Sequence, residues 1–100
     1  MKIVGICACT SGIAHTYISR EKLVNAGQKR GHTISIETQG TIGTEFELTP
    51  LEIEQADIVI LAVDIKVSED RFKGKKVVKV PTHIAIKAAN QLIAKLEAEV

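Results

Sequence analysis

The sequence has few aromatic residues, few cysteines and no excess of charge of either sign. Aromatic residues make up 3% of its 100 positions, too few for a surface on which nucleic-acid bases stack. Lys and Arg number 13 against 12 Asp and Glu, so the basic excess of a general nucleic-acid-binding protein is missing. Two cysteines are too few for the disulfide framework of a small secreted protein. No apolar run approaches the ~20 residues of a membrane span or leaves room for a secretory signal core, so we expect a cytoplasmic protein.

Apolar residues make up 45% of the sequence, which is enough for one hydrophobic core at this length. Segments with the pattern of strands alternate with segments that have the pattern of helices. Strands are predicted over residues 2–8, 33–38, 57–63 and 76–80, and helices over 13–30, 50–56 and from 82 onward. Residues 39–44 are predicted to form a loop, and residues 67–72 have no clear pattern.

This alternation predicts an α/β fold with a parallel sheet and right-handed connections. We expect residues 1–100 to form a single domain around an open four-stranded parallel sheet. The expected strand order is Rossmann-like, 2-1-3-4, with helices on both faces of the sheet. The clearest local signal is a capping box at Thr49-Pro50-Leu51-Glu52, which predicts the start of the second helix.

The loop after the first strand is the best candidate for a functional site, because parallel sheets bind ligands where the strand order reverses. It consists of Cys9, Thr10, Ser11, Gly12, Ile13, Ala14, His15 and Thr16. A strand, a tight turn and a helix start direct backbone N–H groups and the positive end of the helix dipole to one spot. Such a spot stabilises negative charge, whether on a thiolate or on a phosphoryl group attached to it. Cys9 is therefore a candidate nucleophile and residues 10–16 a candidate phosphate-binding loop; the alternative is a plain strand end followed by a helix cap.

Other residues have weaker signals. Gln39, Gly40 and Asp64 follow neighbouring strands and are candidates for the rim of the site. Loop capping explains Asp64 equally well, and turn formation is the preferred interpretation of Gln39 and Gly40. Cys7 lies on the same strand face as Cys9, but no second cysteine pair completes a zinc site, so it is predicted to be a core residue. A basic cluster is predicted to be a solvated turn; it comprises Arg71, Lys73, Lys75 and Lys76.

The segment from Cys9 to Tyr17 reads C-T-S-G-I-A-H-T-Y. It resembles the C-P-T-G-I-A-H-T-Y of the enzyme IIB domain in the fructose-specific branch of the bacterial phosphoenolpyruvate-dependent sugar phosphotransferase system (PTS). Thr10 stands where the family usually has Pro, and Ser11 where it usually has Thr. The resemblance covers nearly the whole chain and continues through Gly31-His32, residues 36–40, Ile42-Gly43, residues 56–62, Asp64-Ile65 and Arg71-Phe72.

This resemblance implies a cytoplasmic phosphotransferase domain that needs no cofactor or metal. Cys9 would take a phosphoryl group from a phosphohistidine on a IIA partner. The domain would pass that group to a sugar, fructose or similar, that a membrane-embedded IIC partner brings in, and it would associate with the membrane through IIC.

Two alternatives of other classes stay open. A cysteine-loop phosphatase or reductase would act without protein partners, but tyrosine phosphatases of this kind close the loop with an Arg where this sequence has His15. Such an enzyme also needs a carboxylic acid, for which Asp64 is the nearest candidate. A non-catalytic module that binds an anion in the loop would instead have an unreactive Cys9.

Overall fold

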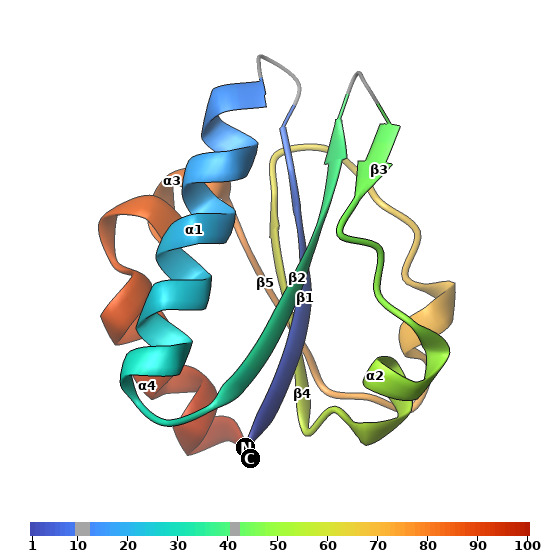
Figure 1. The fold of residues 1–100 in the computed structure, drawn as a ribbon, viewed down its shortest axis with the longest axis vertical. Helices are drawn as coiled ribbons and strands as arrows, with labels where there is room; N and C mark the ends of the chain where they lie inside the picture. Colours follow the sequence, from blue (N-terminus) through green and yellow to red (C-terminus); the bar gives the residue numbers. More distant parts are fainter. Residues whose placement is uncertain (10–12, 41–42) are drawn as a thin grey trace.

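The computed structural model describes residues 1–9, 13–40 and 43–100 (Figure 1). The site predictions on Thr10, Ser11, Gly12 and the side chain of Ile13 lie outside the described residues. The described residues form a five-stranded sheet in the order β3-β2-β1-β4-β5. Its strands are β1 (Lys2–Ala8), β2 (Thr33–Gly40), β3 (Gly43–Glu45), β4 (Ile58–Val63) and β5 (Val77–Val80).

The structure confirms the predicted α/β fold and the relative order of the four predicted strands, which are all parallel. The prediction of four strands was wrong by one, because β2 extends to Gly40 and β3 begins at Gly43, both within the expected loop 39–44. This strand pairs antiparallel with β2, through Thr38 with Glu45 and Gly40 with Gly43. A short, exposed edge strand lacks the apolar alternation by which a strand is recognised in a sequence.

Helices cover both faces of the sheet, as Figure 1 shows. On one face lie α1 (Ile13–Lys29), α3 (Thr82–Lys87) and α4 (Ala89–Glu99), and on the other lie α2 (Pro50–Gln55) and the 3-10 turn η1 (Asp70–Phe72). Each face has its own apolar core. The core beneath α1 includes Cys7, Leu23, Ile60 and Leu96, and the core beneath α2 includes Ile6, Ile53, Leu61 and Phe72.

The predicted last helix is divided into α3 and α4. Ala88 has φ −132° and ψ 37°, outside the helical region, so the chain changes direction there. Both helices nevertheless bury apolar residues in the core beneath α1, namely Ala85 on α3 and Leu92, Ile93 and Leu96 on α4.

The capping box is confirmed. The amide N–H of Glu52 donates to the Thr49 hydroxyl at 3.1 Å, and the Thr49 amide donates to the Glu52 carboxylate at 2.9 Å. Gly31, which follows α1, has φ +82°, the left-handed conformation expected where a helix ends.

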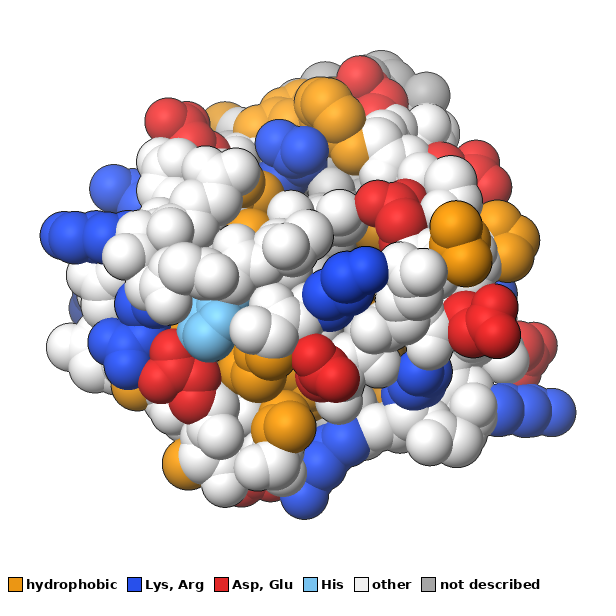
Figure 2. Space-filling view, turned by 60° about the horizontal axis from the view of Figure 1, so that its bottom comes forward, with side chains coloured by type: hydrophobic (Ala, Val, Ile, Leu, Met, Phe, Trp, Pro, Cys, Tyr) orange, Lys and Arg blue, Asp and Glu red, His pale blue; other side chains and the backbone are white. Residues whose placement is uncertain are grey.

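Charged side chains of both signs are interspersed over the face that Figure 2 shows. This agrees with the balanced composition and gives this face no broad field of one sign. Within the described parts of the chain, we find no helix with the length and apolar character that crossing a membrane requires.

Candidate functional site

Cys9 and Asp64 lie side by side at the carboxyl edge of the sheet. The last pair in the register of β1 and β4 is Ala8 with Val63, and Cys9 and Asp64 are the next residues of these two strands. The Asp64 amide donates a hydrogen bond to the Ala8 carbonyl at 2.9 Å, which continues the ladder beyond the strand ends. Cys9 is 5% exposed. The two candidates are therefore brought together by parallel pairing.

The Asp64 carboxylate is held by Thr82, at the start of α3. The Thr82 hydroxyl donates to Oδ2 at 2.6 Å and its amide to Oδ1 at 3.0 Å. These two bonds are the main reason that the pKa of Asp64 lies below its usual value. Partial desolvation acts against them, whereas a hydrogen bond from the Cys9 thiol and the charge of His83 lower the pKa further. Asp64 is thus a fixed carboxylate, ionised at neutral pH, in contact with the candidate nucleophile.

Thr82 was not among the predicted site residues, although its position just after a predicted strand indicates that it lies at the same sheet edge as Asp64. β5 pairs with β4 through Val80 and Ala62, so Thr82 and Asp64 each lie two residues beyond paired positions. The two residues therefore reach the same edge of the sheet. Thr82 is 3% exposed, which fits a side chain whose hydroxyl is committed to the carboxylate.

The first turn of α1 contains both exposed and buried residues. Ala14 and His15 are exposed, whereas Thr16 is buried. The Ser19 hydroxyl donates to the Thr16 carbonyl at 2.9 Å within the buried side of the helix. His15 is therefore accessible to a ligand or a partner, and Thr16 packs toward the sheet.

Cys7 lies in a different environment from Cys9. It is fully buried, and burial raises the pKa of its thiol to about 11 despite a hydrogen bond with Ser19 and the charge of Arg20. Because the thiolate is the nucleophilic form, Cys7 is inert at neutral pH. This agrees with the prediction of a core residue. Among residues 1–9, 13–40 and 43–100, no group of three or more His, Cys, Asp or Glu side chains is placed to hold a metal ion.

The other two candidates for the rim lie at the end of β2. Gly40 pairs with Gly43 where β2 meets β3. The side-chain amide of Gln39 (Nε2) donates to Glu37 Oε2 at 2.7 Å, so this side chain forms its hydrogen bond on the face of the sheet covered by α2. The structure therefore places Gln39 and Gly40 beside the strand ends, with the Gln39 side chain turned toward Glu37.

Glu37 forms a buried ion pair that the sequence analysis missed. It is 1% exposed and accepts two hydrogen bonds from the Arg71 guanidinium, at 2.9 and 2.8 Å, and one from the Leu48 amide at 3.0 Å. Burial alone would raise the pKa of Glu37, but the bonds from Arg71, Gln39 and Leu48 together hold it below its usual value. Arg71 is exposed on the 3-10 turn, as expected of a solvated turn, but the expectation missed that its guanidinium reaches the buried carboxylate.

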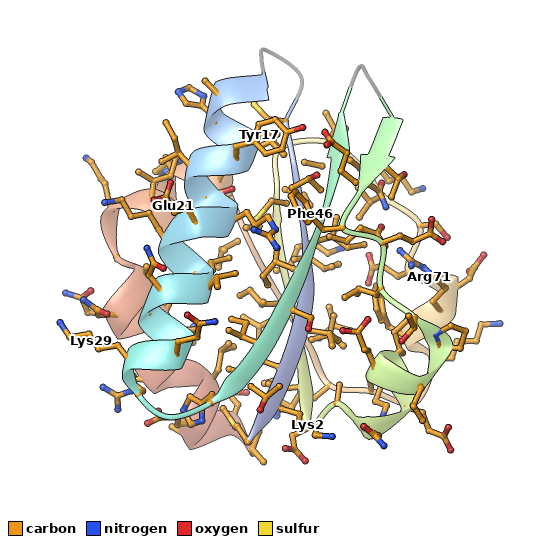
Figure 3. The ribbon with its side chains drawn as sticks, viewed as in Figure 1. Lys2, Tyr17, Glu21, Lys29, Phe46 and Arg71 are labelled. Atoms are coloured by element: carbon orange, nitrogen blue, oxygen red, sulfur yellow. The ribbon has the colours of Figure 1, made fainter. Side chains whose placement is uncertain are left out.

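Phe46, in the segment after β3, lies against Arg20 of α1. Figure 3 shows its side chain directed from the segment after β3 toward α1. There the Arg20 guanidinium lies 3.8 Å from the centroid of the Phe46 ring, and Arg20 Nε donates to the Ile36 carbonyl at 2.9 Å. Phe46 is 55% exposed and has φ +53°, a conformation that non-glycine residues rarely adopt. The contact with Arg20 therefore holds an exposed ring against α1.

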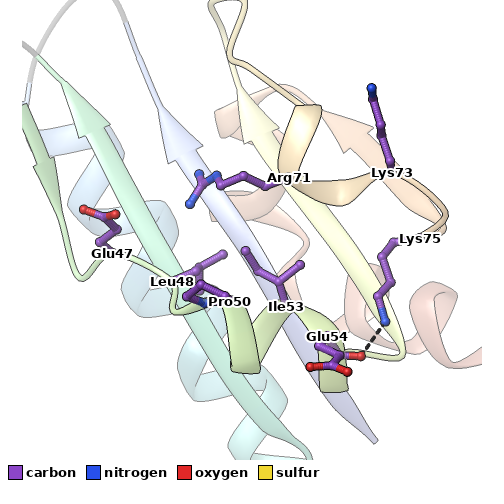
Figure 4. A pocket seen from close by; sticks show the side chains of 8 residues that line it. All are labelled: Glu47, Leu48, Pro50, Ile53, Glu54, Arg71, Lys73 and Lys75. Atoms are coloured by element: carbon purple, nitrogen blue, oxygen red, sulfur yellow. Dashed lines mark hydrogen bonds between the residues drawn. The ribbon is translucent and has the colours of Figure 1, made fainter.

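A cavity of about 520 Å³ lies between α2 and η1 (Figure 4). It is lined by Glu47, Leu48, Pro50, Ile53, Glu54, Arg71, Lys73 and Lys75. Leu48 and Ile53 belong to the core beneath α2, whereas Cys7, two residues before Cys9, belongs to the core beneath α1. The cavity is thus on the opposite face of the sheet from the Cys9 strand end and forms no part of that site.

Comparison with known proteins places this chain in a family. Residues 4–95 match the model of the family described as "PTS system, Lactose/Cellobiose specific IIB subunit". The chain is 45% identical over 98 residues to the "PTS system fructose-like EIIB component 2" of Escherichia coli (strain K12), an alignment that covers 97% of this chain and 92% of that protein. It is 46% identical over 90 residues to the "PTS system fructose-specific EIIB'BC component" of Vibrio cholerae serotype O1, covering 90% of this chain and 16% of that protein.

Solved structures agree. The crystal structure of a domain from the fructose-specific IIABC component of the PTS of Borrelia burgdorferi superposes with a TM-score of 0.90 at 48% sequence identity. The match covers 93% of this chain and 89% of that one. The two domains are therefore similar in sequence as well as in fold.

Proposed function

The chain belongs to the family of PTS IIB subunits and is a component of the fructose type, and from this premise we propose that Cys9 carries the phosphoryl group. A phosphohistidine on a IIA partner is the donor. The P–N bond of the donor breaks, an S–P bond forms on Cys9, and the imidazole nitrogen takes up a proton in place of the one that the thiol loses. Onward transfer breaks the S–P bond and forms a P–O bond on a hydroxyl of the sugar, and the proton of that hydroxyl restores the Cys9 thiol.

The observation that carries this proposal is the different position of the two cysteines in the sheet, since both side chains are buried. Cys9 follows β1 at the carboxyl edge of the sheet and precedes α1 in the sequence, and the N-terminus of a helix favours an anion. Cys7 is fully buried, and its raised pKa keeps it protonated. A domain that transfers phosphoryl groups through a thiol has only Cys9 available for this step, because the sequence contains two cysteines.

The rest of the site follows from the same proposal. Residues Thr10, Ser11, Gly12, Ile13, Ala14, His15 and Thr16 would bind the phosphoryl oxygens, and Gln39, Gly40 and Asp64 would form the rim. We propose that residues 1–100 act as one IIB domain, without a cofactor. The exposed position of His15 is compatible with support of the loop or contact with a partner.

The partners are proposed from the names of the relatives. The Vibrio protein is named an EIIB'BC component, so its name joins B-type units with a C-type unit. The Borrelia domain comes from a IIABC component, whose name joins an A-type, a B-type and a C-type unit. We propose that this domain likewise receives its phosphoryl group from a IIA unit. It would pass the group to fructose or a similar sugar held by a membrane-embedded IIC unit, and thus work at the cytoplasmic side of the membrane.

A matched pair of variants tests the proposal. The wild type, Cys9→Ser and Cys7→Ser are mixed with phosphoenolpyruvate, the upstream carriers and a IIA partner, and each is analysed by intact mass and peptide mapping. We expect a phosphoryl adduct on Cys9 in the wild type and in Cys7→Ser, only when IIA is present, and none in Cys9→Ser. An adduct that persists in Cys9→Ser would place the acceptor elsewhere, and steady hydrolysis of an aryl phosphate by the isolated protein would favour a phosphatase.

A further inference from the structure

We propose that Asp64 is a positioning residue that holds the Cys9 thiol before phosphorylation and, through its negative charge, destabilises the phosphocysteine so that onward transfer is favoured. This inference rests on the proposed function of Cys9 and adds a role for the carboxylate beside it. Its basis is the place of Asp64 in the sheet and the contacts of its carboxylate.

The main chain of Asp64 is fixed against the strand that carries Cys9. Its amide donates to the Ala8 carbonyl at 2.9 Å, and Ala8 precedes Cys9 directly. The two side chains thus start from adjacent positions of neighbouring parallel strands. Displacement of one main-chain position relative to the other would require breaking the ladder between β1 and β4.

The carboxylate itself is held in place. Both of its oxygens accept hydrogen bonds from Thr82, at 3.0 and 2.6 Å, and Thr82 is buried at the start of α3. A carboxylate with both oxygens engaged does not rotate away when its neighbour changes. His83, which is exposed on the first turn of α3, is a titratable group whose charge acts on Asp64.

Phosphorylation turns the favourable contact between the Cys9 and Asp64 side chains into a repulsive one. In the unphosphorylated protein the Cys9 thiol donates a hydrogen bond to the Asp64 carboxylate. Once the phosphoryl group replaces the thiol hydrogen, no donor is left, and an ionised carboxylate stands beside a group with up to two negative charges. Like charges on neighbouring side chains repel. Burial of the Cys9 thiol strengthens this repulsion, whereas Asp64 is exposed, so water screens part of it. The phosphocysteine is therefore raised in free energy relative to the free thiol, which favours the departure of the phosphoryl group.

The substitution Asp64→Asn tests the charge. An asparagine can still accept from the Thr82 amide and donate to the Thr82 hydroxyl, so the geometry is kept while the charge is removed. Asp57→Asn is the matched control, because Asp57 precedes β4 at the opposite end of the strand and accepts from the Lys2 amide at 2.8 Å. Both variants are equilibrated with a phosphorylated IIA partner, and the fraction phosphorylated on Cys9 is measured by intact mass.

We expect the equilibrium constant for phosphorylation of Cys9 to rise about fivefold in Asp64→Asn, because water screens the exposed carboxylate, and to stay within about twofold of wild type in Asp57→Asn. A ³¹P titration gives a second readout: the second ionisation of the phosphocysteine should occur at lower pH in Asp64→Asn, because the neighbouring carboxylate no longer opposes it. A purely structural role would not move this ionisation. If Asp64→Asn does not fold, Asp64→Ser provides a second variant without the charge.

The outcomes separate this inference from the proposed function. Unchanged equilibrium and unchanged ³¹P titration in Asp64→Asn, with wild-type Cys9 phosphorylated, would overturn the role of Asp64 and leave the carrier function standing. No adduct on wild-type Cys9, with a competent phosphorylated IIA present, would overturn both. Thr82→Val retains the charge of Asp64 and the amide bond to Oδ1 but removes the hydroxyl bond to Oδ2, so it should shift the equilibrium less than Asp64→Asn. A shift as large as that of Asp64→Asn, with the carboxylate still ionised, would refute the charge argument.

Discussion

Loss of Arg71 should destabilise the protein strongly and change how its stability depends on pH. Glu37 is 1% exposed and depends on Arg71 for two of its hydrogen bonds. In Arg71→Leu the carboxylate keeps the bonds from Gln39 and from the Leu48 amide but loses its counter-charge. A buried charge without its partner is costly, and breaking such a pair typically costs about 3–5 kcal/mol.

The structure places this variant near the lower end of that range. The Arg71 side chain is 35% exposed, so water partly screens its charge in the folded protein. We therefore expect a loss of about 3 kcal/mol at pH 7, a large part of the roughly 5–15 kcal/mol by which a domain of this kind is stable. Urea unfolding followed by circular dichroism measures this difference directly.

The contribution of Glu37 to the unfolding free energy should depend on pH in opposite directions in the wild type and in Arg71→Leu. In the wild type the pKa of Glu37 is lowered, so the contribution of Glu37 is present above its ordinary value of 4.5 and is lost as the pH falls through the lower, folded-state pKa. In Arg71→Leu the largest contact that lowers the pKa is gone and burial dominates, which moves the folded-state pKa above its ordinary value. The folded state then binds the proton more readily than the unfolded state, so the variant should regain part of its lost stability as the pH falls from 7 toward 5.

A double-mutant cycle with Glu37→Gln provides the control. The glutamine keeps an acceptor for the Leu48 amide but carries no charge, so removing Arg71 from this background should cost only about 1 kcal/mol. The reasoning is refuted if Arg71→Leu loses less than about 1 kcal/mol at pH 7, or if its unfolding free energy follows pH as the wild type's does.

Three further changes test other parts of the structure. Cys7→Ser should lower the unfolding free energy by about 1–3 kcal/mol, because it places a hydroxyl at a fully buried position, and a urea titration that shows no loss would contradict this packing. Gly5→Ala should cost at least about 1–3 kcal/mol, since a Cβ there would press on the Ile60 carbonyl oxygen and lie 2.6 Å from its Cγ2; unchanged thermal unfolding would show that the strands can separate freely. Thr49→Ala removes one half of the capping box with Glu52 and should cost about 1 kcal/mol, measurable by urea unfolding against Thr44→Ala on the exposed edge strand.

Much of the fold follows from patterns that depend on nearby residues alone. The nearly continuous apolar stretch at residues 2–8 predicts a strand covered on both faces, and the structure has β1 at the centre of the sheet. Thr49 and Glu52 define a helix start within four residues. By contrast, β3 exists because it pairs with the end of β2, and its own three residues contain no signal for a strand. The direction change at Ala88 occurs without a Gly or Pro beside it, so no local rule would have placed it.

The neighbourhood of Cys9 and Asp64 was predictable for the same physical reason that the fold was. Parallel strands bring their carboxyl ends to one edge, so residues that follow β1 and β4 must meet there. The pairing of Glu37 with Arg71 was not predictable in this way. Glu37 alternates with Ile36, which favours an exposed position, but α2 and η1 cover that face and bury it. Its partner lies 34 residues further along the chain, where only the tertiary fold brings it close.

The ion pair and the side chain of Cys7 lie on different sides of the sheet, so variants of the ion pair and variants near Cys9 test separate parts of the structure. Cys7 and Ile36 face α1, whereas Glu37 and its ion pair face α2, so damage to the ion pair should reach Cys9 only through the stability of the whole sheet. At a temperature where Arg71→Leu remains folded, its phosphorylation by a IIA partner should therefore match that of the wild type. Reduced acceptance by the folded variant would show that the network acts on the site directly, and the hydrogen bond between Gln39 and Glu37 at the end of β2 is the contact through which it would do so.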